Sequence, residues 1–128
     1  MRQEQAEELV QLIERLREEN DAHAVIVEGR KDERALRSLG LSGKILRLDR
    51  GDSVFNFCEG LVRHDKVVIL TDWDRKGGRL ARALRDGLKA NGIPYDDEFR
   101  KQIAFLVRKE IKDVEGLPKL LSKFPGSR

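Results

Sequence analysis

The chain of 128 residues has little of what marks several protein classes. Its one cysteine, Cys58, excludes an internal disulfide and a zinc finger built on thiolates. No apolar run approaches the length of a membrane span, and the N-terminus lacks a signal-peptide pattern, so we expect a cytoplasmic protein with no membrane partner. The 26 Lys and Arg residues exceed the 23 Asp and Glu residues by only three. The overall charge therefore identifies no partner, and only the positions of the charged residues can indicate one.

Residues 3–19 are predicted to form an amphipathic helix, because apolar residues recur there at spacings of three and four. The apolar residues of this stripe are Ala6, Leu9, Ile13 and Leu16. We expect residues 1–20 to form a helix that is packed on, or appended to, a domain over residues 21–128. The helix could pack on that domain or pair with a protein partner, and simple packing is favoured.

After this helix, short apolar runs alternate with helical patterns. The predicted strands are 22–29, 44–48, 66–70 and 102–107. The predicted helices are 31–40, 53–64, 77–91 and 113–123. This alternation indicates an α/β fold with a mainly parallel, four-stranded sheet. Ligands of such sheets bind beyond the carboxyl ends of the strands, so a site is expected there.

Two of the predicted helices have informative faces. In the helix over 53–64, Phe55, Cys58 and Val62 share one face, so Cys58 is expected to be a core residue and not a nucleophile. The helix over 77–91 carries a basic stripe, opposite a leucine face that we expect to pack on the core. The stripe consists of Arg79, Arg82, Arg85 and Lys89, and the leucines are Leu80, Leu84 and Leu88.

Acidic residues follow three of the four predicted strands. They are Glu28 and Asp32 after the first strand, Asp72 and Asp74 after the third, and Asp113 and Glu115 after the fourth. Because the carboxyl ends of parallel strands meet at one edge of a sheet, we expect these acids to converge. Carboxylates that lie close together disfavour each other's ionisation unless a cation sits between them. Oxygen-only ligands suit Mg²⁺ or Mn²⁺, and both histidines, His23 and His64, are expected to be structural.

The spacing of Asp72 and Asp74 fits a shared ion, since residues i and i+2 of an extended segment point the same way. Taken singly, Asp72 could instead be a helix N-cap and Asp74 a solvated loop acid. Glycines follow both groups of acids: Gly29 is expected to let the backbone turn tightly behind Glu28. Gly77 and Gly78 are expected to allow close approach at the start of the next helix.

Two segments of the chain together resemble the Toprim domain. They are Glu28-Gly29 after the first strand and Asp72-Trp73-Asp74-Arg75-Lys76-Gly77 after the third. That domain occurs in bacterial-type primases, topoisomerases, recombination-repair proteins and small maturation nucleases. The resemblance spans about residues 22–122 and is strongest to the small, stand-alone Toprim proteins of archaea. It implies a three-layer α/β/α, Rossmann-like fold.

The resemblance also implies roles. In the family the Glu acts as general acid or base and the two Asp bind Mg²⁺, which assigns catalysis to Glu28 and metal binding to Asp72 and Asp74, with Glu28 assisting. Further metal-site acids of the family resemble Asp32, Asp113 and Glu115. Many members have a small residue or Pro where Trp73 stands, and we expect Trp73 to anchor the loop rather than to stack on a base.

These features predict phosphodiester chemistry on RNA or DNA, by a nuclease or a nucleotidyl transferase. The cations expected to hold phosphates are Arg30, Lys31, Arg75, Lys76, Arg79 and Arg82. A topoisomerase would need a nucleophilic tyrosine in a separate domain, and the one tyrosine, Tyr95, lies in a polar turn. The alternative is a catalytically weak nucleic-acid-binding or metal-binding module of a larger complex. A phospho-acceptor receiver domain is disfavoured, because it expects an acidic pair where this chain has Glu28-Gly29.

Overall fold

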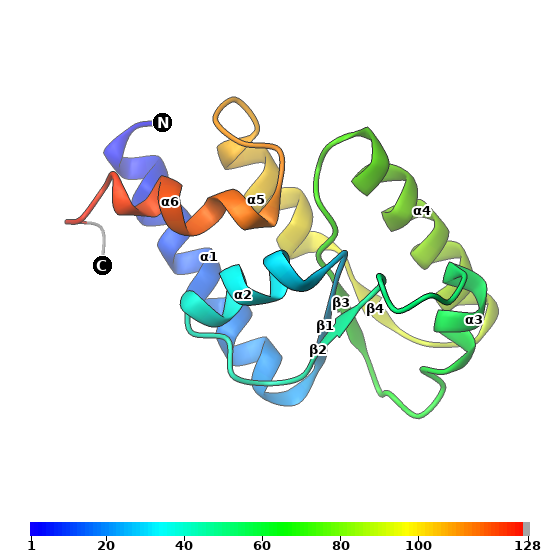
Figure 1. Cartoon of the computed structure of the whole chain (residues 1–128). Coiled ribbons are helices and arrows are strands. Elements are labelled where there is room, and N and C mark those ends of the chain that lie inside the picture. The colour runs from blue at the N-terminus through cyan, green and yellow to red at the C-terminus, as the bar shows by residue number, and fades with distance from the viewer. Residues whose placement is uncertain (127–128) are drawn as a thin grey trace.

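The computed structural model describes residues 1–126 and consists of one sheet between two layers of helices (Figure 1). The helices are α1 (Gln3–Ala22), α2 (Arg30–Ser38), α3 (Val54–Glu59), α4 (Arg75–Ala90), α5 (Glu98–Val107), the 3₁₀ helix η1 (Val114–Gly116) and α6 (Leu117–Ser122). The strands are β1 (Ala24–Val27), β2 (Ile45–Arg47), β3 (Val67–Ile69) and β4 (Tyr95–Asp96).

The sheet has the strand order β2-β1-β3-β4, and each neighbouring pair is parallel. Val25 of β1 lies beside Ile45 of β2 on one side and beside Val68 of β3 on the other. The chain leaves β1 toward one edge and later returns to β3 on the other side. The strand order therefore reverses between β1 and β3, which is the place where ligands bind in open α/β sheets.

Alternate strand residues face the two helical layers, as expected for strands that are buried on both faces. Val25 and Val27 face a core with α1, α2, α5 and α6, whereas Ala24 and Ile26 face a core with α3 and α4. Figure 1 shows these two groups of helices on opposite sides of the sheet. The prediction of a three-layer α/β/α fold with a mainly parallel four-stranded sheet is confirmed.

The prediction of a fourth strand over residues 102–107 is wrong. These residues lie in α5, and the fourth strand is the short β4 that precedes it. Within the segment, Ile103 and Val107 are fully buried while Phe105 between them is 70% exposed, which is a helical spacing. A short apolar run has too little periodicity to distinguish a strand from a buried helix, and this one belongs to the helix.

The N-terminal helix is part of the core. Its predicted apolar stripe is buried, with Ala6, Leu9 and Leu16 completely covered, and it packs against α5. The side chain of Asn20 near the end of α1 is also buried and joins three segments. Its Nδ2 donates to the carbonyl oxygens of His23 (3.1 Å) and Lys44 (2.9 Å), and its Oδ1 accepts from the amide of Gly43 (2.8 Å). No helix within residues 1–126 is long and apolar enough to cross a membrane.

The expected face of the helix over 53–64 is only partly correct. Cys58 is fully buried against α4, but Phe55 and Val62 are each 60% exposed. The observed α3 is short and ends before Val62, so the helical spacing that would align the three residues is not maintained. A Cβ on Gly87 of α4 would lie 2.7 Å from the Cys58 sulfur, which shows how closely the two helices approach.

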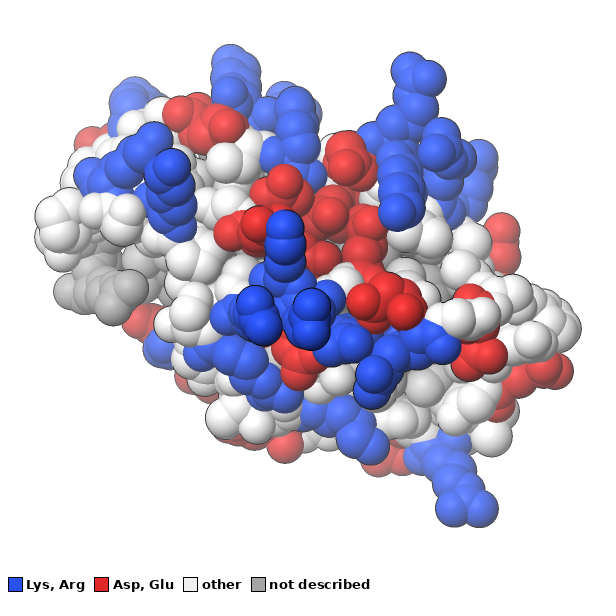
Figure 2. All heavy atoms as spheres, in the orientation of Figure 1, with Lys and Arg blue, Asp and Glu red and all other residues white. Residues whose placement is uncertain are grey.

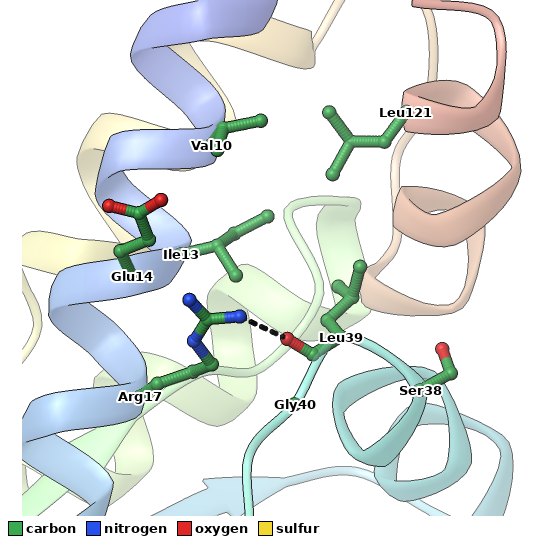
Figure 3. A pocket seen from close by; sticks show the side chains of 8 residues that line it. All are labelled: Val10, Ile13, Glu14, Arg17, Ser38, Leu39, Gly40 and Leu121. Carbon is green, nitrogen blue, oxygen red and sulfur yellow. Dashed lines mark hydrogen bonds between the residues drawn. The ribbon is translucent and has the colours of Figure 1, made fainter. Parts of the chain in front are cut away.

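A hollow of about 240 Å³ lies between α1, the end of α2 and α6. Val10 and Ile13 of α1 face Leu121 of α6 across it (Figure 3). Arg17 closes one side by donating a hydrogen bond of 3.3 Å to the carbonyl oxygen of Leu39. The next residue, Gly40, has a φ of +101°, which favours glycine and ends α2 as the sequence predicts.

Candidate functional site

Two acidic residues meet where the strand order reverses. Glu28 directly follows β1, and Asp72 follows β3 after Leu70 and Thr71. The backbone N–H of Asp72 donates to Oε2 of Glu28 at 3.0 Å, which joins the two strand ends. Both side chains are half-buried, so each is partly withdrawn from water and still accessible to a ligand.

Asp72 carries the most perturbed carboxyl group of the site. Burial, followed by the nearby charges of Asp32, Glu28 and Asp113, raises the pKa of Asp72 from 3.8 to about 7, against the lowering effect of a hydrogen bond from the Val114 amide. That hydrogen bond, to Oδ1 of Asp72, is 2.9 Å long. The side chain is thus held by backbone from the far end of the chain while other acids surround it.

Asp32 adds a buried acid from the first turn of α2. Its Oδ2 accepts a 3.1 Å hydrogen bond from the backbone N–H of Gly29. Burial raises the pKa of Asp32, and the carboxylates of Glu28, Glu115 and Asp113 add to this effect. We call Glu28, Asp32, Asp72, Asp113 and Glu115 the acidic cluster, because their charges act on one another. Like charges gathered in this way favour binding of a cation.

Asp113 and Glu115 belong to the cluster, but the element that precedes them differs from the prediction. They follow α5 rather than a strand, and the intervening loop is tied to the end of β3 by Trp73. The Trp73 amide donates to the carbonyl oxygen of Lys112 (3.0 Å), and its indole Nε1 donates to that of Ile111 (2.8 Å). Trp73 also packs against the core, so the expectation that it anchors the loop is confirmed.

Asp74 has a structural role at the start of α4. It is the N-cap of this helix, and its Oδ1 accepts a 2.7 Å hydrogen bond from the amide of Gly77. The sequence suggested Asp72 as the cap and Asp74 as a solvated acid, but α4 begins at Arg75 and makes Asp74 the cap. Asp74 is exposed and is not among the carboxylates that raise the pKa of Asp72.

Glycine is required at one of the three expected positions. A Cβ on Gly77 would collide with the carbonyl oxygen of Asp72, so the close approach predicted at the start of this helix is observed. Gly78 has open space around the Cβ position. The chain bends at Glu28 and Gly29 as expected, but Gly29 has an extended backbone with a φ of −155°, which any residue adopts, so this bend does not require glycine.

Arg100 is a residue of the site that the sequence analysis missed. It lies on α5 and donates from Nε to the carbonyl oxygen of Thr71 (3.0 Å) and from a terminal nitrogen to that of Asp72 (2.7 Å). Burial lowers the pKa of Arg100, while the carboxylates of Asp97, Glu28 and Asp72 partly offset this. Arg100 therefore fixes the backbone that carries Asp72. No local signal marked it, because its partners are 28 and 29 residues away in the sequence.

The donor chemistry of the cluster fits a hard divalent cation. Glu28, Asp32, Asp72 and Asp113 each have one carboxylate oxygen held by a backbone amide, and none of their second oxygens accepts a hydrogen bond from residues 1–126. Within the same residues, no three Asp, Glu, His or Cys side chains are close enough to enclose a metal ion. Mg²⁺ typically uses one or two carboxylates, with waters and phosphate oxygens completing its shell, so an open arrangement is compatible with it.

Cations lie on both sides of the acidic cluster (Figure 2). They include cations of α2 and α4. The residues expected to bind nucleic acid are Arg30, Lys31, Arg75, Lys76, Arg79 and Arg82. All of them are exposed, and none makes a side-chain hydrogen bond or ion pair within the described part of the chain. By contrast, Arg85 of the predicted stripe is half-buried and pairs with Asp97 at 3.2 Å.

Comparison with known proteins places this chain in a family. The model of the Toprim domain matches residues 23–106, which contain Glu28, Asp32, Asp72 and Asp74. A UPF0292 protein of Methanosarcina barkeri is 40% identical over 119 residues, covering 91% of this chain and 82% of the relative. A UPF0292 protein of Methanocaldococcus jannaschii is 32% identical over 124 residues, covering 95% and 96%. A solved structure of a protein from Aquifex aeolicus has a TM-score of 0.69 at 25% identity and covers 82% of this chain and 94% of its own.

Proposed function

Because this chain belongs to the Toprim family, we propose that it performs Mg²⁺-dependent phosphodiester chemistry on RNA or DNA, as a nuclease or nucleotidyl transferase. Toprim membership by itself indicates a metal-dependent function related to nucleic acid. The observation that carries the finer proposal is the acidic cluster at the reversal of strand order, where the pKa of Asp72 is raised to about 7. Acids are gathered where a phosphate would have to approach. A bound cation would compensate the negative charge of the acids and of the phosphate.

In this proposal Glu28 moves the proton. One of its oxygens is held by the Asp72 amide, which orients the carboxyl group, and the other accepts no hydrogen bond from residues 1–126. A carboxyl group fixed in this way can act as a general acid or base on the attacking or leaving oxygen. Asp72 would hold the metal with Asp74 and Glu28, and Asp32, Asp113 and Glu115 would contribute to the same site. When bound, Mg²⁺ or Mn²⁺ supplies charge neutralisation at the phosphate.

The unpaired cations of α2 and α4 would hold the phosphates on either side of the reacting one. Arg30 and Lys31 begin α2, and Arg75, Lys76 and the following turn belong to α4. Figure 2 shows cations on more than one side of the acids. Exposed cations that have no partner within the protein retain their full capacity for phosphate oxygens.

The proposal is tested by an activity screen of the wild-type chain and of Asp72→Asn. Structured RNA, single strands and nicked duplexes are incubated with Mg²⁺, with Mn²⁺ and with EDTA, and the products are resolved on denaturing gels. We expect product in the presence of either metal, no product in EDTA, and none from Asp72→Asn. Equal turnover by the variant, or turnover that persists in EDTA, would contradict the proposal.

A second candidate is a binding module that has little or no catalytic activity of its own. It is favoured by the absence, within residues 1–126, of any group of three acids close enough to enclose a metal ion. Such a module would bind nucleic acid through the same cations but would give no metal-dependent product in the screen. A protein partner at the N-terminal helix stays a proposal. Because the apolar stripe of α1 is buried in the core, this partner would have to contact the polar face of the helix.

A further inference from the structure

A hollow of about 380 Å³ opens beside the acidic cluster, between α2 and the η1–α6 segment. It is lined by Lys31, Arg34, Ala35, Glu115 and Pro118. Glu115 belongs to the cluster, since its charge raises the pKa of Asp32, and Lys31 is the neighbour of Asp32 in α2. The hollow therefore adjoins the acids in the helical layer that contains α2 and α6.

The cations of this hollow are left without partners, unlike the next cation of the same helix. Arg37 donates to the carbonyl oxygens of Leu41 (3.1 Å) and Gly43 (2.7 Å) and pairs with Glu33. Lys31 and Arg34 make no side-chain hydrogen bond or ion pair within residues 1–126. Both are exposed, although Glu115 lines the same hollow. Their spacing of three residues places them on one face of α2, toward the hollow.

The lining combines three kinds of surface. Lys31 and Arg34 provide positive charge, Ala35 and Pro118 provide apolar surface, and Glu115 provides a carboxylate on the side of the acidic cluster. A nucleotide unit combines an anionic phosphate with a sugar and base that present flat apolar faces. Arg is particularly suited to such a ligand, because its guanidinium group contacts phosphate in a bidentate manner and stacks on planar rings.

We propose that this hollow binds the nucleotide next to the reacting phosphate, with Lys31 and Arg34 holding its phosphate group and Ala35 and Pro118 contacting its sugar or base. The proposal rests on the proposed function and extends it, because it adds Arg34 and Pro118 to the site. It also predicts that the nucleic-acid strand on one side of the reacting phosphate runs over α2. Arg75, Lys76, Arg79 and Arg82 in the first half of α4 then contact the strand on the other side of the reacting phosphate.

The test measures binding rather than turnover. The probe is a short, single-stranded, fluorescein-labelled oligonucleotide, prepared as RNA and as DNA, and its anisotropy is followed at several salt concentrations. Measurements are made in EDTA and with Ca²⁺ in place of Mg²⁺, and a denaturing gel checks that the strand is intact. The variant is Lys31→Ala/Arg34→Ala. The matched control, Arg63→Ala/Lys89→Ala, also removes two exposed, unpaired cations. Lys89 lies at the far end of α4, about 20 Å along the helix axis from Arg75.

We expect Lys31→Ala/Arg34→Ala to lower affinity by about tenfold or more and to reduce the salt slope by about 0.7, since the two cations contact one phosphate group and each neutralised phosphate of a single strand contributes about 0.7. The control should stay within about twofold, and Arg34→Lys should keep the slope because it keeps the charge. Circular dichroism checks that the variants are folded. Equal losses in variant and control, or no binding by wild type in either condition, would overturn the proposal.

The two proposals fail in different ways. If wild type binds the strand and Lys31→Ala/Arg34→Ala does not, but neither gives a metal-dependent product, the hollow is a binding site and the proposed chemistry is wrong. If wild type cleaves or joins strands while Lys31→Ala/Arg34→Ala binds with unchanged affinity and slope, the chemistry stands and the hollow is not part of it.

Discussion

The charged side chains at the two ends of the parallel sheet are arranged in opposite ways. At the amino ends of the strands, Glu19 pairs with Lys66 at 2.8 Å and lies 3.8 Å from His23. The interaction with Glu19 is the largest cause of the raised pKa of Lys66. At the carboxyl ends, acids face acids around Asp72, and the nearby cations of α2 and α4 remain unpaired.

This difference in the arrangement of charges affects the stability of the two ends differently. Opposite charges that are paired compensate each other within the folded state, and the amino end has this arrangement. Gathering carboxylates in a half-buried place lowers stability unless a ligand compensates. The carboxyl end is therefore the end at which the proposed cation would add to stability. A substitution at one end of the sheet therefore tests whether stability, turnover or binding at the other end changes.

The largest effect is expected for Glu28→Gln at the carboxyl end. Gln keeps the size of the side chain and an oxygen that can accept from the Asp72 amide, but it cannot exchange a proton. Turnover should fall by about 10²-fold or more, while nucleic-acid binding stays within a few-fold. Gel-based initial rates and anisotropy measure the two quantities. The control is Glu59→Gln, an exposed acid of α3 without a partner in the described chain. Undiminished turnover in Glu28→Gln would leave Glu28 as a metal ligand at most.

At the amino end, Asn20→Ala should affect stability without affecting chemistry. The change removes three hydrogen bonds and leaves the carbonyl oxygen of Lys44 and the amide of Gly43 without this partner. The free energy of unfolding should fall by about 2 kcal/mol, as is typical when buried polar groups lose their partners. Denaturant unfolding measures this. Turnover per folded molecule should be that of wild type, and a large loss would show that the two ends are coupled.

Asp72→Asn should raise stability in the absence of metal, and the gain should depend on pH. Between about pH 4 and pH 7 the folded state binds more protons at Asp72 than the unfolded state does, so its contribution to stability falls as pH rises through this range. Above about pH 7 the full penalty is present, and Asn removes it. We expect a gain on the order of 1–2 kcal/mol near pH 8, reduced from the full shift because the half-exposed group is screened by solvent.

The same comparison near pH 4 should show little gain, because Asp72 is then protonated in the folded state. Asn also keeps the oxygen that accepts from the Val114 amide, so packing is preserved. The measurement is denaturant unfolding in EDTA at the two pH values, with the exposed Asp52→Asn as a control that should show no pH-dependent gain. A variant that is less stable than wild type at pH 8 would contradict the account of Asp72.

The smallest effect separates two neighbouring arginines of α4. Arg82 is exposed and unpaired, whereas Arg85 pairs with Asp97. If Arg82 contacts phosphate, Arg82→Ala should reduce the salt slope of binding by about 0.7 to 0.9 with no change in sequence preference. Arg85→Ala should leave the slope unchanged and lower the free energy of unfolding by less than about 1 kcal/mol. Anisotropy measures the salt slope and denaturant unfolding measures the stability of both variants. A lower slope for Arg85→Ala and an unchanged slope for Arg82→Ala would show that Arg85, and not Arg82, contacts phosphate.

The sequence indicated those parts of the site that depend on local patterns. Glu28 and Asp72 each follow an apolar strand, and parallel strands bring their ends together without any knowledge of distant contacts. The alternation of strands and helices likewise predicted the layers. The metal-binding and catalytic roles of these residues stay predictions.

The errors came from features that local patterns do not determine. The segment 102–107 is apolar and short, so its helical state depends on packing against α1. The start of α4 was predicted too late, since the helix begins at Arg75 and not at residue 77, and its N-cap is Asp74 rather than Asp72. Arg100 reaches the site only because α5 lies against β3, and the loop that carries Asp113 reaches it through Trp73. Such long-range contacts leave no trace in the spacing of residues.

The central claim is that the acids after β3 bind a divalent cation, and Mn²⁺ binding tests it most directly. Electron paramagnetic resonance of free Mn²⁺ during a titration compares wild type with Asp72→Asn/Asp74→Asn. Both changes keep an oxygen for the hydrogen bonds from Val114 and Gly77, so the fold should persist. The control is Asp52→Asn/Glu59→Gln, which removes two exposed acids elsewhere. We predict weak Mn²⁺ binding by wild type and control and none by Asp72→Asn/Asp74→Asn. Equal binding by all three proteins would contradict the claim.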